Sequence, residues 1–174
     1  MMRSLSKRIA VGAAFTAVGL LLGYIESFFV LPVHVPGIRI GLANIVSVIS
    51  LFCFGAPFAA TVMILRVLLS ALLFGSPVSL LYSLSGAAVA LGGMILTKRL
   101  GFSVYGVSVS GAVLHNTAQI CIASFLVGSR YVLYYIPALV IAGVVAGIIT
   151  GSVARIIMDR INKIINRYES EGTI

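Results

Sequence analysis

The chain has 174 residues, of which 60% are hydrophobic and only 9% are charged, and its mean hydropathy is +1.17. A soluble domain carries about 25% charged residues, so this composition excludes an ordinary soluble fold and indicates a one-domain integral membrane protein. A net charge of +8 would suggest nucleic acid binding in a soluble protein. Here it indicates basic residues that flank membrane spans, and we expect no nucleic acid partner.

Six apolar runs, separated by glycine, proline and charged residues, predict an all-α protein with six transmembrane helices. In chain order the expected spans are 9–31, 40–54, 58–74, 78–97, 103–127 and 131–157. The second and third runs are shorter than the roughly 20 residues that a straight span needs, so tilt or partial re-entry stays open. We expect residues 1–158 to form the transmembrane domain and 159–174 a polar, partly helical cytoplasmic tail.

Basic residues concentrate on one side of these spans. An even number of spans places both termini on the same side, and nine of the twelve lysines and arginines fall there. They are Arg3, Lys7, Arg8, Lys98, Arg99, Arg155, Arg160, Lys163 and Arg167. The positive-inside rule therefore predicts that both termini are cytoplasmic.

Small residues recur at every fourth position in two spans. They are Ala10/Ala14 and Ala13/Ala17 in the first span, and Gly143, Gly147 and Gly151 in the sixth. Such stripes let a neighbouring helix approach closely. For the alanines, packing within this chain and docking of a partner membrane protein both remain open. Cys53 and Cys121 lie inside apolar runs, where we expect buried packing rather than a disulfide or a metal site.

The stretch from Glu26 to Asn44 interrupts the apolar sequence. It holds one of four acidic residues, one of two histidines, two of five prolines and Arg39. Charged and helix-breaking residues are costly at a membrane boundary unless they have a function. We interpret this stretch as the cap and one wall of a small-molecule pocket that opens to the outside.

Polar residues from several spans are expected near that pocket. Arg66 lies about 12 Å above the inner start of its span and Asn44 about 6 Å below the outer start of its own. An intramembrane arginine needs a carboxylate, backbone carbonyls or a ligand, so Arg66 either pairs with Glu26 or faces a ligand. The full candidate set is Glu26, Arg39, Asn44, Arg66, Ser76, Tyr82, His115, Asn116 and Gln119.

Catalytic signatures are missing from the sequence. There is no GxxxxGK[ST] phosphate loop, no GxSxG and no HExxH. No pair of acidic residues lies within the spans to hold magnesium against a diphosphate. We therefore expect no enzymatic activity, no cofactor and no metal site in this chain.

Several segments carry a resemblance to a known family. They are Pro36-Gly-Ile-Arg-Ile-Gly-Leu-Ala-Asn44, Leu65-Arg-Val-Leu-Leu-Ser70, Leu73-Phe-Gly-Ser-Pro-Val-Ser79, Tyr82-Ser-Leu-Ser-Gly86 and Ser110-Gly-Ala-Val-Leu-His-Asn-Thr-Ala-Gln119. Over about residues 8 to 157 the chain resembles the Gx transporter family, whose members are often labelled heptaprenyl diphosphate synthase component I. That family in turn resembles the S components of energy-coupling-factor (ECF) transporters.

The resemblance implies a six-helix substrate-binding subunit in the plasma membrane of a prokaryotic cell. Its partners would be a transmembrane coupling protein and two ATPases, and Ala10, Ala14 and Ala17 would form the docking face. The excess of basic groups, Arg39, Arg66 and His115, over the single carboxylate of Glu26 favours an anionic or acceptor-rich ligand. A non-catalytic subunit of heptaprenyl diphosphate synthase, an autonomous transporter and a membrane scaffold remain alternatives.

Overall fold

The structure is a computed structural model, and it describes residues 5–28, 41–74 and 76–170. Over these residues the chain is helical, with short turns. The helices are α1 (Leu5–Phe28), α2 (Leu42–Phe54), α3 (Ala56–Phe74), α4 (Pro77–Arg99), α5 (Val104–Val127), the 3-10 helix η1 (Arg130–Tyr135) and α6 (Ile136–Ser170). Each of the first five predicted spans corresponds to one of these helices, and the sixth, 131–157, corresponds to η1 and the first part of α6.

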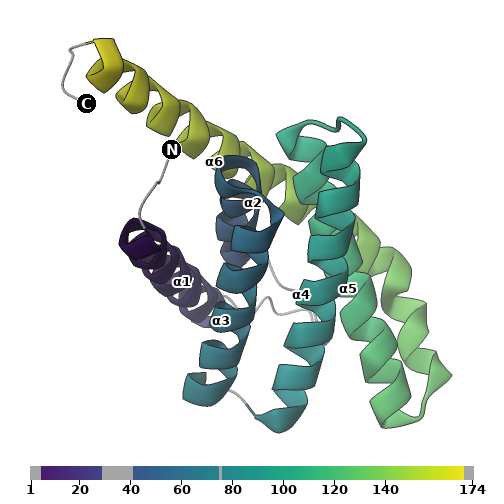
Figure 1. Cartoon of the computed structure of the whole chain (residues 1–174). Coiled ribbons are helices and arrows are strands. Elements are labelled where there is room, and N and C mark those ends of the chain that lie inside the picture. The colour runs from purple at the N-terminus through teal and green to yellow at the C-terminus, as the bar shows by residue number, and fades with distance from the viewer. Residues whose placement is uncertain (1–4, 29–40, 75, 171–174) are drawn as a thin grey trace.

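Five of these helical segments are long and apolar enough to cross a membrane, and α2 is a shorter apolar helix. The chain is therefore a multi-pass membrane protein built as a bundle of helices (Figure 1). With 13 residues, α2 is about 20 Å long, less than the roughly 30 Å of a bilayer's hydrocarbon core.

Glycine and serine residues set the helix ends. Gly55 separates α2 from α3 with a φ of 90°, and Gly128 ends α5 with a φ of 67°. Both angles lie in the region that glycine adopts without strain. At the start of α4, the Ser76 and Ser79 side chains each accept a hydrogen bond from the other's backbone N–H, which forms a capping box.

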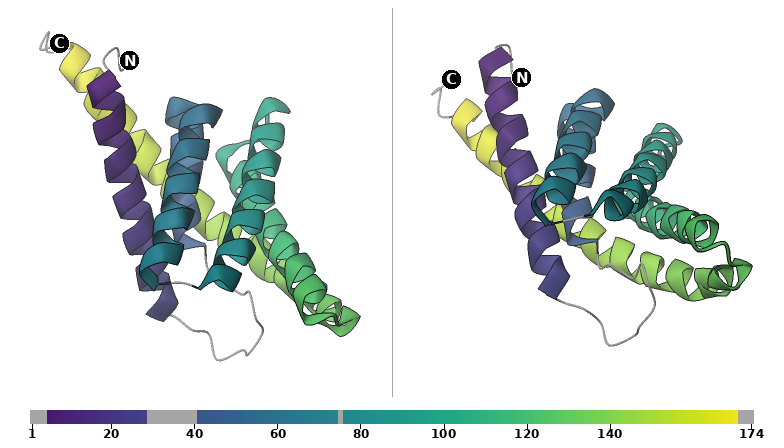
Figure 2. Two further views of the ribbon diagram at one scale, coloured as in Figure 1. Left: turned by 60° about the horizontal axis from the view of Figure 1, so that its bottom comes forward. Right: turned by 90° about the horizontal axis from the view of Figure 1, so that it is seen from below.

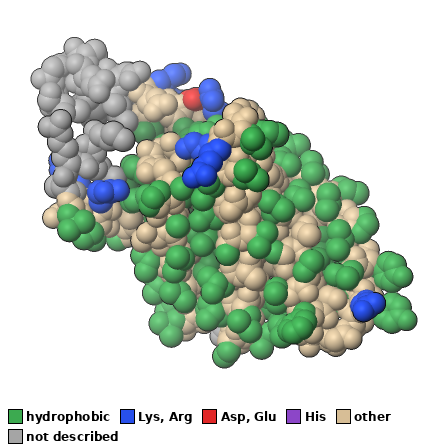
Figure 3. All heavy atoms as spheres, turned by 45° about the vertical axis from the view of Figure 1, so that its right-hand side comes forward, with side chains coloured by type: hydrophobic (Ala, Val, Ile, Leu, Met, Phe, Trp, Pro, Cys, Tyr) green, Lys and Arg blue, Asp and Glu red, His purple; other side chains and the backbone are tan. Residues whose placement is uncertain are grey.

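Successive helices run in alternating directions, so the start of α1 and the end of α6 lie at the same end of the bundle (Figures 1 and 2). We call this the basic end, because most of the described lysines and arginines gather there. These residues are Lys7, Arg8, Lys98, Arg99, Arg155, Arg160, Lys163 and Arg167. Figure 3 shows basic side chains at that end and hydrophobic side chains over the flank. The positive-inside rule predicts that this end is cytoplasmic.

The glycine stripe of α6 packs directly against α5. A Cβ atom on Gly147 would lie 2.4 Å from the Cα atom of Val109, and one on Gly143 would lie 3.0 Å from that of Val113. Buried hydroxyl groups of Ser108 and Thr150 also bond across this interface at 2.9 Å. The predicted close approach at this stripe is confirmed, and it holds α5 and α6 together.

The alanine face of α1 points away from the bundle. Ala10, Ala13, Ala14 and Ala17 are all exposed. The opposite face packs instead, with Thr16 and Glu26 buried and Gly12 against the ring of Phe58. The alternative in which the alanine face packs against other helices of this chain is therefore wrong for the described residues.

The expected helical part of the tail is observed, because α6 runs without a break from Ile136 to Ser170 and is about 50 Å long. The two cysteines meet a different outcome. Cys53 and Cys121 are exposed rather than buried. Lipid-facing and core-facing positions are equally apolar in a membrane protein, so their sequence context did not distinguish the two.

Candidate ligand-binding site

Arg66 is a residue of α3, and its side chain lies inside the bundle, next to α1 and α2. It is half-buried and follows the start of α3 by ten residues, or about 15 Å. Its side chain passes over Gly19 of α1, where a Cβ atom would come within 2.8 Å of the Arg66 Cδ atom and 3.8 Å of the Val46 Cβ atom. Gly19 thus provides the room that lets a long cationic side chain lie among α1, α2 and α3.

Glu26 ties the end of α1 to the start of α2. Its side chain is 9% exposed, and its Oε1 atom accepts a hydrogen bond of 2.6 Å from the backbone N–H of Gly41. Gly41 has a φ of 77°, in the left-handed region, and immediately precedes α2. Glu26 therefore has a defined role at a helix start, while its pairing with Arg66 stays a prediction.

His115 and Gln119 lie one turn apart on the same face of α5, and both contact α4 at Gly86. A Cβ atom on Gly86 would lie 2.8 Å from the Gln119 Cγ atom and 3.0 Å from the His115 Cε1 atom. Gln119 is 6% exposed, and its buried Oε1 atom has no hydrogen-bond partner among the described residues. An unsatisfied amide oxygen is thus held at the α4–α5 interface.

Asn44 lies farther from the predicted outer surface than the sequence indicated. Its Nδ2 atom is 3.4 Å from the position that a Cβ atom on Gly111 would take, and Gly111 is only about 10 Å along α5 from Val104. The difference arises because α2 is short and its first turn starts inside the bundle. The buried Nδ2 atom of Asn44 has no hydrogen-bond partner in the described part of the chain.

Asn116 points in a different direction from His115 and Gln119. It is 4% exposed, and its Nδ2 atom donates a hydrogen bond of 3.3 Å to the backbone carbonyl of Leu139 in α6. One position along a helix turns a side chain by about 100°, so Asn116 faces α6 when its neighbours face α4. This contact gives Asn116 a structural role between α5 and α6.

Tyr82 and Ser76 lie toward the end opposite the basic end. Tyr82 is half-buried on α4, one turn before Gly86. Ser76 is exposed, and its side chain accepts from the backbone N–H of Ser79 as the cap of α4. Arg39 and most of the predicted cap, residues 29–40, lie outside the described residues.

These positions bring complementary polar groups into an apolar bundle. Arg66 supplies a positive charge, Asn44 an N–H donor and Gln119 a carbonyl acceptor, from α3, α2 and α5. Gly19 makes space for the Arg66 side chain, and Gly86 makes space for Gln119. Asn44 contacts α5 at Gly111, which is eight residues, or about 12 Å, along the helix from Gln119, so a ligand would have to span that distance to meet both groups.

The chain matches the family model described as heptaprenyl diphosphate synthase component I over residues 15–157. No curated protein and no solved structure matches it. The family match covers every polar position described above, from Glu26 to Gln119, whereas Ala10 and Ala14 precede it. The chain therefore belongs to the heptaprenyl diphosphate synthase component I family, the Gx transporter family that its motifs resemble.

Proposed function

We propose that this chain is the substrate-binding membrane subunit, or S component, of an ECF-type importer. Its ligand is a small anionic micronutrient or precursor, and the chain itself performs no chemistry. It resides in the plasma membrane of a prokaryotic cell and passes its ligand to a transmembrane coupling protein driven by two ATPases. The proposal extends the resemblance of the family to S components.

The observation that carries this proposal is the pair of unsatisfied amide atoms inside the bundle. The Nδ2 atom of Asn44 and the Oε1 atom of Gln119 are buried without hydrogen-bond partners among the described residues. Leaving a polar atom in this state costs about 1–3 kcal/mol. A ligand with both an acceptor and a donor would recover that free energy, and Arg66 would favour a negative charge on it.

The exposed alanine face of α1 supports the choice of partner. This face consists of Ala10, Ala14 and Ala17, which lie on one side of the helix. All three are exposed among the described residues. Small residues at this spacing allow the backbone of a second membrane helix to approach. We assign this face to the coupling protein.

The family description favours a second candidate, a membrane component of heptaprenyl diphosphate synthase in isoprenoid-quinone synthesis. Prenyl transfer needs carboxylate-bound magnesium to neutralise the leaving diphosphate. Of the four acidic residues, only Glu26 lies within an apolar span, and its carboxylate already accepts from Gly41. In this candidate role the chain would be non-catalytic.

Native mass spectrometry of the purified protein tests the proposed ligand site. We expect a small molecule to remain bound to the wild type and to Thr117→Ala, but not to Gln119→Leu. Thr117 is a matched control, because its hydroxyl group donates to the carbonyl of Val113 within its own helix. Equal retention in all three proteins would count against the site.

Gene deletion separates the two functions. If the chain were a synthase component, its loss would lower long-chain prenyl diphosphate synthesis in cell extracts. Unchanged synthesis would remove that candidate.

A further inference from the structure

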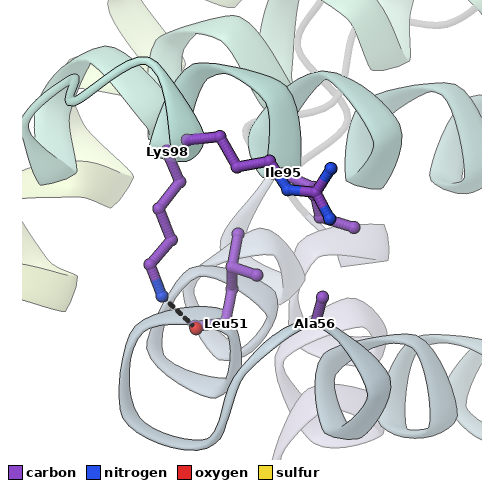
Figure 4. Close-up of a pocket in the computed structure, with 5 residues that line it drawn as sticks. Leu51, Ala56, Ile95 and Lys98 are labelled. Carbon is purple, nitrogen blue, oxygen red and sulfur yellow. Dashed lines mark hydrogen bonds between the residues drawn. The ribbon is translucent and has the colours of Figure 1, made fainter.

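A pocket lies at the basic end, away from the candidate ligand site. It has a volume of about 260 Å³ and lies where α2 ends, α3 begins and α4 ends (Figure 4). Its lining residues are Leu51, Ala56, Ile95, Lys98 and Arg99. Lys98 is about 18 Å along α4 from Gly86, so this pocket is separate from His115 and Gln119, which pack at Gly86.

Lys98 is held in place at this pocket. Its ammonium group donates a hydrogen bond of 2.7 Å to the backbone carbonyl of Leu51, in the last turn of α2, as Figure 4 shows. The same nitrogen lies 4.7 Å from the centroid of the Phe52 ring. An ammonium group has three N–H donors, and Leu51 accepts only one of them. Lys98 therefore presents a fixed positive charge with donor capacity to spare.

Arg99 adds a second cation to the lining. It is exposed, and its guanidinium group offers up to five N–H donors in a geometry that matches phosphate oxygens. None of the described lining residues carries a carboxylate. Two cations in a lining that is otherwise apolar over the described residues make this a site for an anionic group.

The surroundings of the pocket are apolar and exposed. Leu96 is 58% exposed and Leu100 is 66% exposed, both beside the two cations on α4. Ala88 and Gly92, on the same face of α4 as Ile95, are exposed too, and a Cβ atom on Gly92 would meet nothing within 4 Å. A molecule with a charged head and an apolar tail fits such a boundary better than a fully soluble anion.

We propose that this pocket binds the phosphate head group of an anionic membrane lipid. Lys98 and Arg99 would contact the phosphate, Leu51, Ala56 and Ile95 would surround the adjoining backbone of the lipid, and the acyl chains would remain in the bilayer. Basic pockets between helices on the cytoplasmic side are typical lipid head-group sites. This inference is independent of the proposed transport function.

Lipid titrations of the full-length protein, followed by native mass spectrometry, test the proposal. We expect phosphatidylglycerol to bind more tightly than phosphatidylcholine. Arg99→Gln should weaken phosphatidylglycerol binding about tenfold, the effect of losing one charge-assisted hydrogen bond. Arg99→Lys, which keeps the charge, should lose less. Because Arg99 is exposed and the Lys98–Leu51 bond remains, Arg99→Gln should still fold.

Arg160→Gln is the matched control. It removes one exposed positive charge from the same end but lies outside the pocket. Equal weakening by Arg99→Gln and Arg160→Gln would overturn the proposal, since it would indicate attraction by the whole basic surface. Equal binding of the two phospholipids would also overturn it. Tighter binding of soluble diphosphate than of phosphatidylglycerol would reassign the pocket from a lipid head group to a free anion.

Discussion

Replacing Gly86 by alanine should disturb the contact that places His115 and Gln119 in the bundle. The new Cβ atom would lie 2.8 Å from the Gln119 Cγ atom and 3.0 Å from the His115 Cε1 atom, where 3.4–4 Å is ordinary contact. Both side chains must move at once, and the imidazole ring is rigid. Overpacking of this kind costs about 1–3 kcal/mol. Alanine also favours a helix over glycine by about 1 kcal/mol, which offsets part of that cost.

Gly92→Ala isolates the packing cost. Gly92 lies on the same helix, but nothing is within 4 Å of its Cβ position, so the substitution brings the helix-favouring effect alone. We expect the two variants to differ by about 1–3 kcal/mol in the free energy of unfolding, with Gly86→Ala the less stable. In detergent this should appear as a gap of several degrees in Tm. Equal Tm values would refute the placement of His115 and Gln119 against α4.

Three further predictions concern the site and the bundle. Arg66→Ala should abolish retention of the bound molecule in native mass spectrometry, although the variant should still fold and unfold cooperatively. Arg66→Lys should retain part of the bound molecule. If Arg66→Ala does not fold at all, the arginine has a purely structural role. Glu26→Gln should destabilise the start of α2 by about 1 kcal/mol, because the amide oxygen still accepts from the Gly41 N–H but the charge-assisted hydrogen bond becomes a neutral one, and an unchanged Tm would contradict that contact. Gly147→Ala should lower Tm more than Gly86→Ala, because its Cβ atom would meet the backbone of Val109 rather than side chains.

Much of the fold follows from the sequence, because apolar runs and helix-breaking residues are local signals. Gly55-Ala-Pro57 and Gly128 mark helix ends that lie within a few residues of those observed. The glycine stripe at Gly143, Gly147 and Gly151 correctly indicated a close helix contact, since only small residues permit it.

The site was less predictable, because it depends on which helix each side chain faces. Periodicity groups His115 with Gln119 and separates Asn116, but only the packed bundle shows that the first two face α4 and the third faces α6. Asn44 was expected close to the outer surface, because its depth was estimated from its distance along the chain to the start of its span. That estimate assumes that each helix starts at a membrane boundary. The short helix α2 starts inside instead, beside Gly111.

The contact made by Lys98 could not be predicted from the sequence either. In the sequence, Lys98 and Arg99 mark the end of an apolar run, as basic residues commonly do. The structure shows that Lys98 reaches across to the Leu51 carbonyl, 47 residues away in the chain. A long-range contact of this kind leaves no local pattern, so the pocket at the basic end could not be anticipated.

Affinity isolation of the tagged chain from the membranes of its own cells tests the central claim most directly. If the chain is an S component, a transmembrane coupling protein and two ATPases should be recovered with it in defined ratio. Ala14→Leu, which adds bulk to the exposed face of α1, should reduce that recovery without lowering Tm, because Ala14 is exposed. Recovery of the chain alone, from cells that contain such coupling modules, would contradict the account.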